Sequence, residues 1–224
     1  FTDLNPSAGN VTSVVGDVAT IDGINAARLT LKSNTLVNIN NVKVYYAPAY
    51  QLWVGKTQVT SVNKGNVLAG DPVNDGKVSY DPGKNILTLK GADISGENGN
   101  YTQDQADRCS TIRTDLADLT INVTSDSTVT GPGAGADWTY GYGIFASACN
   151  LTITGEGELT ASDSSNSYST GVRAKNVFLN GRFAASGKTT NDSAIGCGVV
   201  VTENITINEG AELTAVGIGE RGIA

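Results

Sequence analysis

Short runs of alternating hydrophobic and polar residues recur along the second half of the chain. Three of these runs start with an asparagine, and the asparagines lie 26 and 28 residues apart. The three runs are Asn150–Ile153, Asn176–Leu179 and Asn204–Ile207. Alternation of this kind buries one face of a β-strand and leaves the other face in solvent. The repeat therefore predicts strands at equivalent positions of a repeated structural unit.

Each of these strands is flanked by two more strand patterns. A run that opens with a glycine precedes the asparagine, and a second alternating run follows it after a glycine-bearing turn. The glycines are Gly143, Gly171 and Gly198, and the following runs are residues 158–161, 182–185 and 212–215. Residues 85–88 and 118–121 extend the series toward the N-terminus. Each repeat is thus predicted to contain three short strands.

Stacking is the arrangement that buries the inward side chains of such repeats. With no helical pattern between the strands, each inward residue can lie on its counterpart one turn away, and all strands can pair in parallel. A leucine-rich repeat would need a helix-forming segment that this pattern lacks. We therefore expect an all-β fold, a right-handed parallel β-helix (β-solenoid) of about five coils over residues 85–224. The recurring asparagines are expected to form amide ladders between coils.

The first 90 residues follow a different pattern. Residues 50–54 and 57–60 flank Gly55-Lys56, and residues 77–81 and 85–89 flank an Asp-Pro-Gly turn, so both pairs predict hairpins. We expect residues 48–90 to be a hairpin-containing cap, because an open β-helix end exposes unpaired strand edges. Residues 1–47 form a short β-rich segment of unassigned topology, with β-patterned runs at 11–15, 28–31 and 42–46. Gly222–Ala224 resembles the opening of a further coil, so we expect the β-helix to continue beyond the chain end.

Composition narrows the classes of partner and cofactor. The net charge is −7, which excludes nucleic acid as a partner because its binding depends on clustered Lys and Arg. No segment has the 18 apolar residues that predict a membrane span. The absence of histidine removes Ser-His-Asp and Cys-His catalysis and the common zinc sites. Cys109, Cys149 and Cys197 are too scattered for a disulfide framework and are expected to be buried. No cofactor is expected, but calcium stays open as an alternative, because carboxylate and amide oxygens are its usual ligands.

Four segments of the chain occur together, and in the same order, in a known class of proteins. They are Tyr50–Gly55, Val59–Thr60, Val78–Pro82 and Leu87–Ala92. On these segments, residues 48–224 resemble a module of Gram-positive gut bacterial cell-surface proteins, in which a right-handed β-helix often described as carbohydrate-binding follows. The resemblance implies an exported, multidomain surface protein that contacts glycans, and it implies no particular functional residue.

The richest polar stretch lies between residues 93 and 108. It contains Asp93, Glu97, Asp104, Asp107 and Arg108, which are the residue types of a calcium-dependent polysaccharide lyase. They belong to one long loop and do not occupy matching positions on successive coils. We therefore interpret them as a solvated loop and predict no catalytic residue.

A corner of the predicted coils concentrates aromatic residues. Trp138, Tyr140 and Tyr142 lie within five residues, beside Asp137 and in an insertion rich in glycine. Sugar rings pack on flat aromatic faces, and a carboxylate accepts hydrogen bonds from sugar hydroxyls, so these four residues are the predicted ligand-binding site. The alternative is that they pack as a flap against the β-helix. Trp53, by contrast, alternates with apolar neighbours and is expected in the core of the cap.

These observations favour a binding module over an enzyme. We expect an extracellular adhesion or glycan-binding module, secreted or on a bacterial cell surface, whose partner is a polysaccharide or a host or surface glycan. Two alternatives stay open: a polysaccharide lyase or glycosidase on the same fold, and a structural stalk of a larger surface protein. Paired carboxylates on adjacent coils within about 10 Å would favour the enzyme. Exposed coplanar aromatic rings would favour binding.

Overall fold

The computed structural model places most of the chain in β-strands. It describes residues 4–6, 10–15, 18–22, 29–31, 43–96, 108–133, 140–165, 167–189 and 194–219, and before residue 48 and at Arg108 it describes only the backbone. The chain divides into two compact units, residues 1–50 with 60–62 and residues 51–59 with 63–224. No helix occurs within the described ranges, which agrees with the sparse helix-forming residues of the sequence. The same ranges contain no apolar helix long enough to span a bilayer.

The N-terminal unit contains two small groups of strands. β1 (Leu4–Pro6) pairs antiparallel with β4 (Leu29–Leu31). β2 (Asn10–Val15) pairs antiparallel with β3 (Val18–Asp22), and β3 pairs in parallel with β5 (Lys43–Ala47). The β-patterned runs identified in this part of the sequence overlap β2, β4 and β5.

Two hairpins precede the parallel strands. β6 (Ala49–Val54) and β7 (Thr57–Thr60) are neighbours across Gly55-Lys56, and Gly55 has the positive φ of 57° that glycine adopts without strain in a tight turn. β8 (Val78–Asp81) pairs antiparallel with β9 (Ile86–Lys90). Both hairpins were predicted from the sequence and are confirmed.

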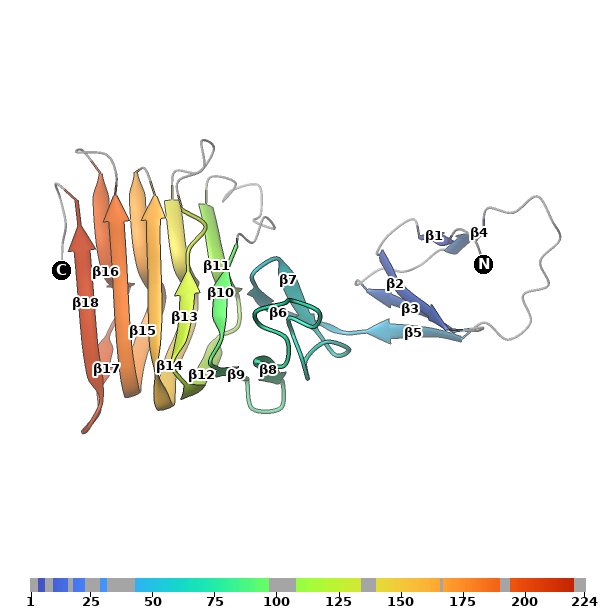
Figure 1. Ribbon diagram of the computed structural model, residues 1–224, viewed down its shortest axis with the longest axis horizontal. Helices are drawn as coiled ribbons and strands as arrows, with labels where there is room; N and C mark the ends of the chain where they lie inside the picture. Colours follow the sequence, from blue (N-terminus) through green and yellow to red (C-terminus); the bar gives the residue numbers. More distant parts are fainter. Residues whose placement is uncertain are drawn as a thin grey trace. The chain divides into compact units, whose positions relative to one another are not determined.

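The remaining strands form a β-solenoid of stacked parallel strands (Figure 1). β14 (Tyr140–Ser165) and β15 (Tyr168–Thr189) each run through a whole turn and pair with each other in parallel along their length. The other strands of the solenoid are shorter and follow one another around a turn. They are β10 (Asp93–Ser95), β11 (Arg108–Thr114), β12 (Asp118–Ser125), β13 (Ser127–Thr130), β16 (Ile195–Val201), β17 (Ile205–Ile207) and β18 (Glu212–Ile218).

Pairing between turns produces three parallel ladders. The first ladder runs β11–β14–β15–β16, the second β9–β12–β14–β15–β17 and the third β10–β13–β14–β15–β18. β14 and β15 contribute to all three ladders because each bends around the whole turn. The prediction of three strands per repeat is therefore confirmed.

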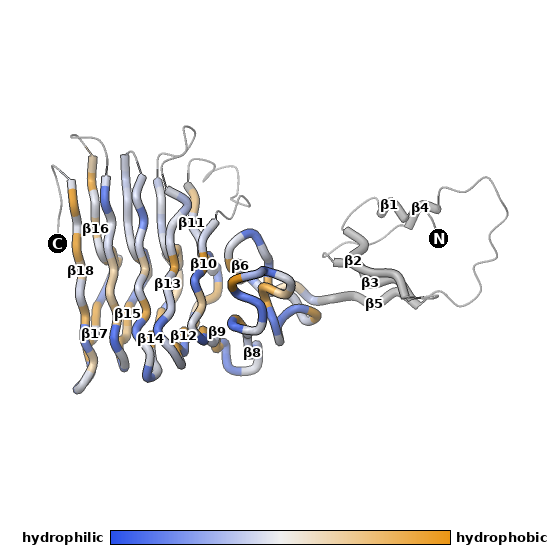
Figure 2. The backbone as a smooth tube through the Cα atoms, viewed as in Figure 1, coloured by the Kyte–Doolittle hydropathy of each residue, from blue (hydrophilic) through white to orange (hydrophobic). Residues whose placement is uncertain are grey.

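Apolar side chains stack in columns inside the solenoid. In the second ladder Leu119, Leu151 and Val177 are in register, and none of them is more than 1% exposed. Burial of each such side chain contributes roughly 1.5–3 kcal/mol relative to an exposed one. Figure 2 shows hydrophobic and hydrophilic stretches alternating along these strands, as the sequence pattern predicts.

The apolar side chains of β17 are more exposed than their counterparts on the preceding turns. Ile205 and Ile207 are in register with the buried Val177 and Leu179 of β15, yet they are 41% and 50% exposed. Within the described residues β16, β17 and β18 pair with β15 and with no further strand. The core column continues into this turn but is covered there from one side only.

A ladder of polar side chains connects the turns at the start of the second ladder. Asn150 Nδ2 donates a hydrogen bond to Asp118 Oδ1 at 2.9 Å, and Asn176 Nδ2 donates to Asn150 Oδ1 at 2.9 Å. Asn176 Oδ1 in turn accepts from the backbone N–H of Asn204 at 2.9 Å. Asn176 also donates to Glu203 Oε2 at 2.8 Å, which holds the pKa of that carboxyl below its usual range. The predicted amide ladder is confirmed, with an aspartate in its first position.

The first strand of each ladder is also paired on its other edge. β6 pairs antiparallel with β11, and β8 pairs antiparallel with β9. The third ladder starts with β10, where the Asn74 side chain accepts from the backbone N–H of Asp93 and donates to its carbonyl, both at 2.8 Å. Trp53 of β6 is buried, as predicted, and its ring lies 4.9 Å from the guanidinium of Arg113. Strand edges that would otherwise be open are thereby satisfied.

We predict that Asn176→Ala destabilises the solenoid by about 1–3 kcal/mol, because the buried Asn176 side chain makes hydrogen bonds to both neighbouring turns and all of them are lost. Chemical denaturation followed by circular dichroism measures the change. Asn208→Ala is the matched control, since Asn208 is exposed and, among the described residues, its side-chain amide bonds to Asn180 alone. Equal effects of the two substitutions would contradict a structural role for the asparagine ladder.

Candidate functional site

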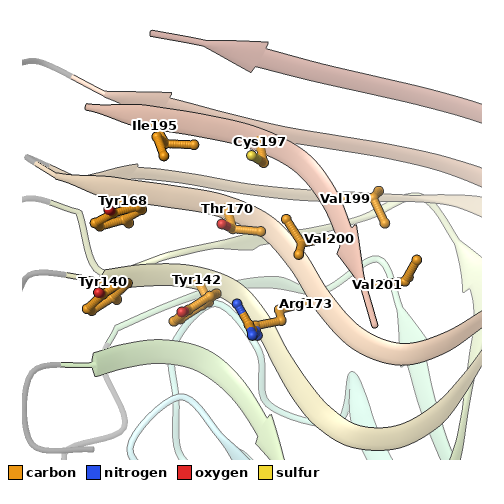
Figure 3. Close-up of a pocket in the computed structure, with 10 residues that line it drawn as sticks. All are labelled: Tyr140, Tyr142, Tyr168, Thr170, Arg173, Ile195, Cys197, Val199, Val200 and Val201. Atoms are coloured by element: carbon orange, nitrogen blue, oxygen red, sulfur yellow. The ribbon is translucent and has the colours of Figure 1, made fainter. Parts of the chain in front are cut away.

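A groove of about 490 Å³ lies on the first ladder, across β14, β15 and β16 (Figure 3). Ten residues line it, and most are aromatic or aliphatic; none is acidic. They are Tyr140, Tyr142, Tyr168, Thr170, Arg173, Ile195, Cys197, Val199, Val200 and Val201. A concave, largely apolar surface with a few polar groups is the usual form of a ligand site.

A column of glycines explains where the groove lies. Gly143, Gly171 and Gly198 face the inside of the solenoid. A Cβ atom at Gly171 would lie 2.7 Å from the backbone nitrogen of Ser186, and one at Gly198 would lie 2.6 Å from that of Val216. No side chain fits between these glycines and the strands of the third ladder. The first ladder therefore approaches the third closely at the glycine positions. The groove lies on the opposite side of the strands, since neighbouring side chains in a strand point to opposite faces.

Tyrosines from successive turns form one wall of the groove. Tyr140 and Tyr168 are in register, and their rings stack with centroids 4.6 Å apart and an interplanar angle of 16°. Each ring covers one face of the other, and Tyr168 is 38% exposed, so this ring is accessible to a ligand. Tyr142, the next outward residue, is 2% exposed and packs against Phe145 at a ring distance of 4.8 Å. Tyr142 thus forms the floor of the groove.

Arg173 is the charged residue of the groove. It lies on β15 in register with Phe145 of β14 and Val200 of β16. Its Nε atom is inaccessible to solvent and has no hydrogen-bond partner within the described part of the chain. Figure 3 shows the guanidinium beside the Tyr142 ring.

The structure brings together two of the four residues predicted to bind a ligand. Tyr140 and Tyr142 both line the groove, whereas Asp137 and Trp138 lie outside the described residues. Sequence reasoning missed Tyr168 and Arg173. The repeat itself carried a signal for Tyr168, because the 28-residue spacing of Gly143 and Gly171 also aligns this tyrosine with Tyr140.

The acidic stretch considered for lyase chemistry lies largely outside the described residues. Glu97, Asp104 and Asp107 are not described, and Arg108 is described by its backbone alone. Asp93 is exposed on β10, where its backbone bonds to Asn74. Across the described ranges, no group of three or more Cys, Asp or Glu side chains is arranged to hold a metal ion.

Arg182, on the third ladder, forms ion pairs with two carboxylates that lie on adjacent turns. Arg182 Nη2 lies 3.3 Å from Asp126 Oδ1, and its Nη1 lies 3.6 Å from Glu158 Oε2. The backbone N–H of Glu158 also donates to Asp126 Oδ1 at 2.8 Å. All three side chains are substantially exposed, so each ion pair contributes little to stability. The arrangement is that of a surface ion-pair network connecting three turns.

The carboxyl group of Asp163 is buried inside the solenoid near Gly141, at the start of β14. Asp163 is 3% exposed and accepts a hydrogen bond from the Ser165 hydroxyl and one from the backbone N–H of Gly133. Its side chain occupies the space where Gly131 and Gly141 lack a Cβ atom. Burial raises the pKa of Asp163 above its usual value of 3.8, although these hydrogen bonds act in the opposite direction.

The raised pKa of Asp163 predicts a loss of stability with rising pH. The folded state binds more protons than the unfolded state between pH 3.8 and the higher folded-state pKa, so the free energy of unfolding decreases as pH rises through this interval. Each pKa unit of separation corresponds to about 1.4 kcal/mol. Asp163→Asn is expected to remove this decrease, and urea titrations at several pH values measure it. The exposed Asp126→Asn is the control; an unchanged pH profile in Asp163→Asn would contradict the assignment.

The three cysteines are buried, as predicted, and they form no disulfide with one another. Cys149 is fully buried, and burial together with the nearby Asp118 carboxylate raises the pKa of its thiol to about 12. A thiolate is the reactive form of cysteine, so this environment makes Cys149 a poor nucleophile. Cys197 lines the groove and is 8% exposed.

We expect Cys149 to resist alkylation in the folded protein. With a pKa of about 12, roughly one thiol in ten thousand is ionised at pH 8, and the group is also shielded from the reagent. Iodoacetamide labelling followed by peptide mass spectrometry tests this expectation, with the urea-unfolded chain as the reference. Labelling of Cys149 at the same rate in both states would show that the thiol is accessible.

Comparisons with protein-family models, with curated proteins and with solved structures find no match to this chain. The function of the groove therefore has to be inferred from its own residues. Its distinguishing features are the stacked tyrosines, the apolar valine wall and one guanidinium without an acidic neighbour in the lining.

Proposed function

We propose that this chain is a non-catalytic polysaccharide-binding module, secreted or displayed on a bacterial cell surface, and that the groove on β14, β15 and β16 is its binding site. The observation that carries the proposal is the pair of tyrosines, Tyr140 and Tyr168, that line the groove from successive turns with stacked rings. Aromatic side chains pack against the apolar C–H surfaces of sugar rings, and phenol hydroxyls exchange hydrogen bonds with sugar hydroxyls.

The geometry of the groove supports a chain-like ligand. The lining residues come from three adjacent strands, so the groove runs across the strands and along the stacking direction. Val199, Val200 and Val201 supply an apolar wall, and Thr170 adds a hydroxyl. A saccharide that follows this direction would meet an equivalent position on each turn. The corner that contains Asp137 and Trp138 is proposed to extend the same site.

The finer description of the fold is part of this proposal. We propose a right-handed solenoid of five coils over residues 85–224, in which β9 and β10 belong to the first coil. Residues 48–90 act as its cap, and residues 1–47 form a separate short segment. The pairing of β6, β8 and Asn74 with the first strand of each ladder supports the capping role.

Binding to a panel of neutral and charged polysaccharides, with and without calcium, tests the proposed function. The wild-type chain is expected to bind at least one polymer in affinity electrophoresis, and Tyr168→Ala to weaken that binding by roughly five- to tenfold. Trp138→Ala shows whether the corner loop takes part. Tyr50→Ala is the matched control, because Tyr50 is partly exposed and does not line the groove.

Thermal unfolding of each variant shows whether a loss of binding is local to the groove. Binding that Tyr168→Ala and Tyr50→Ala reduce equally would place the site elsewhere. If the wild-type chain binds no polysaccharide under either calcium condition, the proposal fails and a structural stalk becomes the better account.

A further inference from the structure

Arg173 differs from the other arginines whose side chains the structure describes. Arg113 occupies the same column of the first ladder, two turns earlier, and its Nη2 lies 2.8 Å from Asp115 Oδ2. Arg182 contacts the carboxylates of Asp126 and Glu158. Arg173 has neither an ion pair nor a hydrogen bond within the described residues. Of these three guanidinium groups, two are thus paired with carboxylates of the chain and the one in the groove is not.

The guanidinium of the half-buried Arg173 is positioned to pair with an anionic ligand. Removing a charged group from water is unfavourable unless another group compensates for the lost hydration. The wall around Arg173 consists of tyrosine and valine side chains, and no lining residue carries a negative charge. The planar fork of arginine matches a carboxylate, to which it can donate two parallel hydrogen bonds. The chemistry that complements the groove is thus an apolar ring surface bearing a carboxylate.

We propose that the groove selects saccharides that carry a carboxylate, and that Arg173 is the residue that pairs with this carboxylate. The inference rests on the proposed polysaccharide binding and specifies its ligand class. The stacked rings of Tyr140 and Tyr168 contact the sugar, while Arg173 on the adjacent part of β15 binds the acidic group. Arg173 is a specificity-determining residue in this arrangement, since a neutral sugar offers its guanidinium hydrogen-bond acceptors but no negative charge.

The negative net charge of the chain means that selectivity for a carboxylate has to come from direct contact with Arg173. At −7 the protein as a whole repels a polyanion at long range. Binding of an acidic saccharide therefore depends on the direct pair with Arg173 and not on a general positive surface. Salt has two opposing effects on the affinity, because it screens both the long-range repulsion and the pair between Arg173 and the carboxylate. The pair is screened less, because it is partly shielded from solvent.

The experiment compares one polymer with and without its carboxylates. Alginate, which carries a carboxylate on every residue, is titrated against carboxyl-reduced alginate, which is neutral, using the full chain and isothermal calorimetry. We expect the wild-type protein to bind alginate on the order of 10- to 100-fold more tightly than the reduced polymer. Dextran sulfate and dextran form a second pair, which distinguishes recognition of a carboxylate from recognition of any anion.

Variants at position 173 assign the selectivity to one side chain. Arg173→Gln is expected to bind both forms of alginate with similar affinity, and Arg173→Lys to keep part of the preference because it keeps the charge but loses the fork. Arg182→Gln is the matched control, since it removes the same charge from a residue outside the groove. Thermal unfolding checks that each variant is folded.

The outcomes separate this inference from the proposed function. Equal binding of alginate and its reduced form, or a carboxylate preference that survives in folded Arg173→Gln, would overturn the role of Arg173 while leaving polysaccharide binding intact. Tighter binding of dextran sulfate than of alginate would replace carboxylate selectivity with general anion binding. If none of the four polymers binds while a neutral polymer of the wider panel does, the inference fails and the proposed function stands. If no polysaccharide binds at all, both fail.

Discussion

Parallel pairing between successive turns, in a defined register within each ladder, places a side chain beside the equivalent residue one turn away. Inside the solenoid this sets Leu151 between Leu119 and Val177, and at the corner it sets Asn176 beside Asn150. A slip of one residue would move the apolar column outward and separate the amides. Hydrophobic burial and the polar ladder therefore enforce the same register independently, and the rest of the structure depends on it.

The register also determines the shape of the outer surface of the first ladder, because it aligns glycines on the inside of successive turns. The glycines at positions 143, 171 and 198 remove side chains from the inside, so the strands approach the opposite face and the outside is hollowed. Outward positions are not restricted to apolar residues. The column that contains Arg113, Phe145, Arg173 and Val200 accordingly mixes charged, aromatic and aliphatic residues, and two of them, Arg113 and Phe145, are buried. Inner columns preserve the fold, and outer columns are free to determine what the protein binds.

The strands and the asparagine ladder could be predicted because their signals are local or strictly periodic. Alternation over four residues identifies a strand, and the 26- and 28-residue spacings identify its partners. The groove was only half predicted, because Tyr140 and Tyr142 are close in sequence whereas Tyr168 and Arg173 reach them through the register. The unsatisfied state of Arg173 depends on which carboxylates lie within reach in three dimensions. The burial of Asp163 also escaped prediction, because the polar run around it gives no alternation that would mark an inward position.

The two ends of the described solenoid differ in how their edges are covered. At one end β6, β8 and Asn74 pair with the first strand of each ladder, whereas at the other Ile205 and Ile207 are about half exposed on β17. In a structure held by nearest-neighbour contacts, a turn supported on one side opens before a turn supported on both. When residues 1–224 are studied by themselves, amide protons of β16, β17 and β18 should accordingly exchange with solvent sooner than those of β14. Local opening of this polypeptide would advance as a front along the axis, removing the valine wall of the groove while the stacked tyrosine rings are still in place.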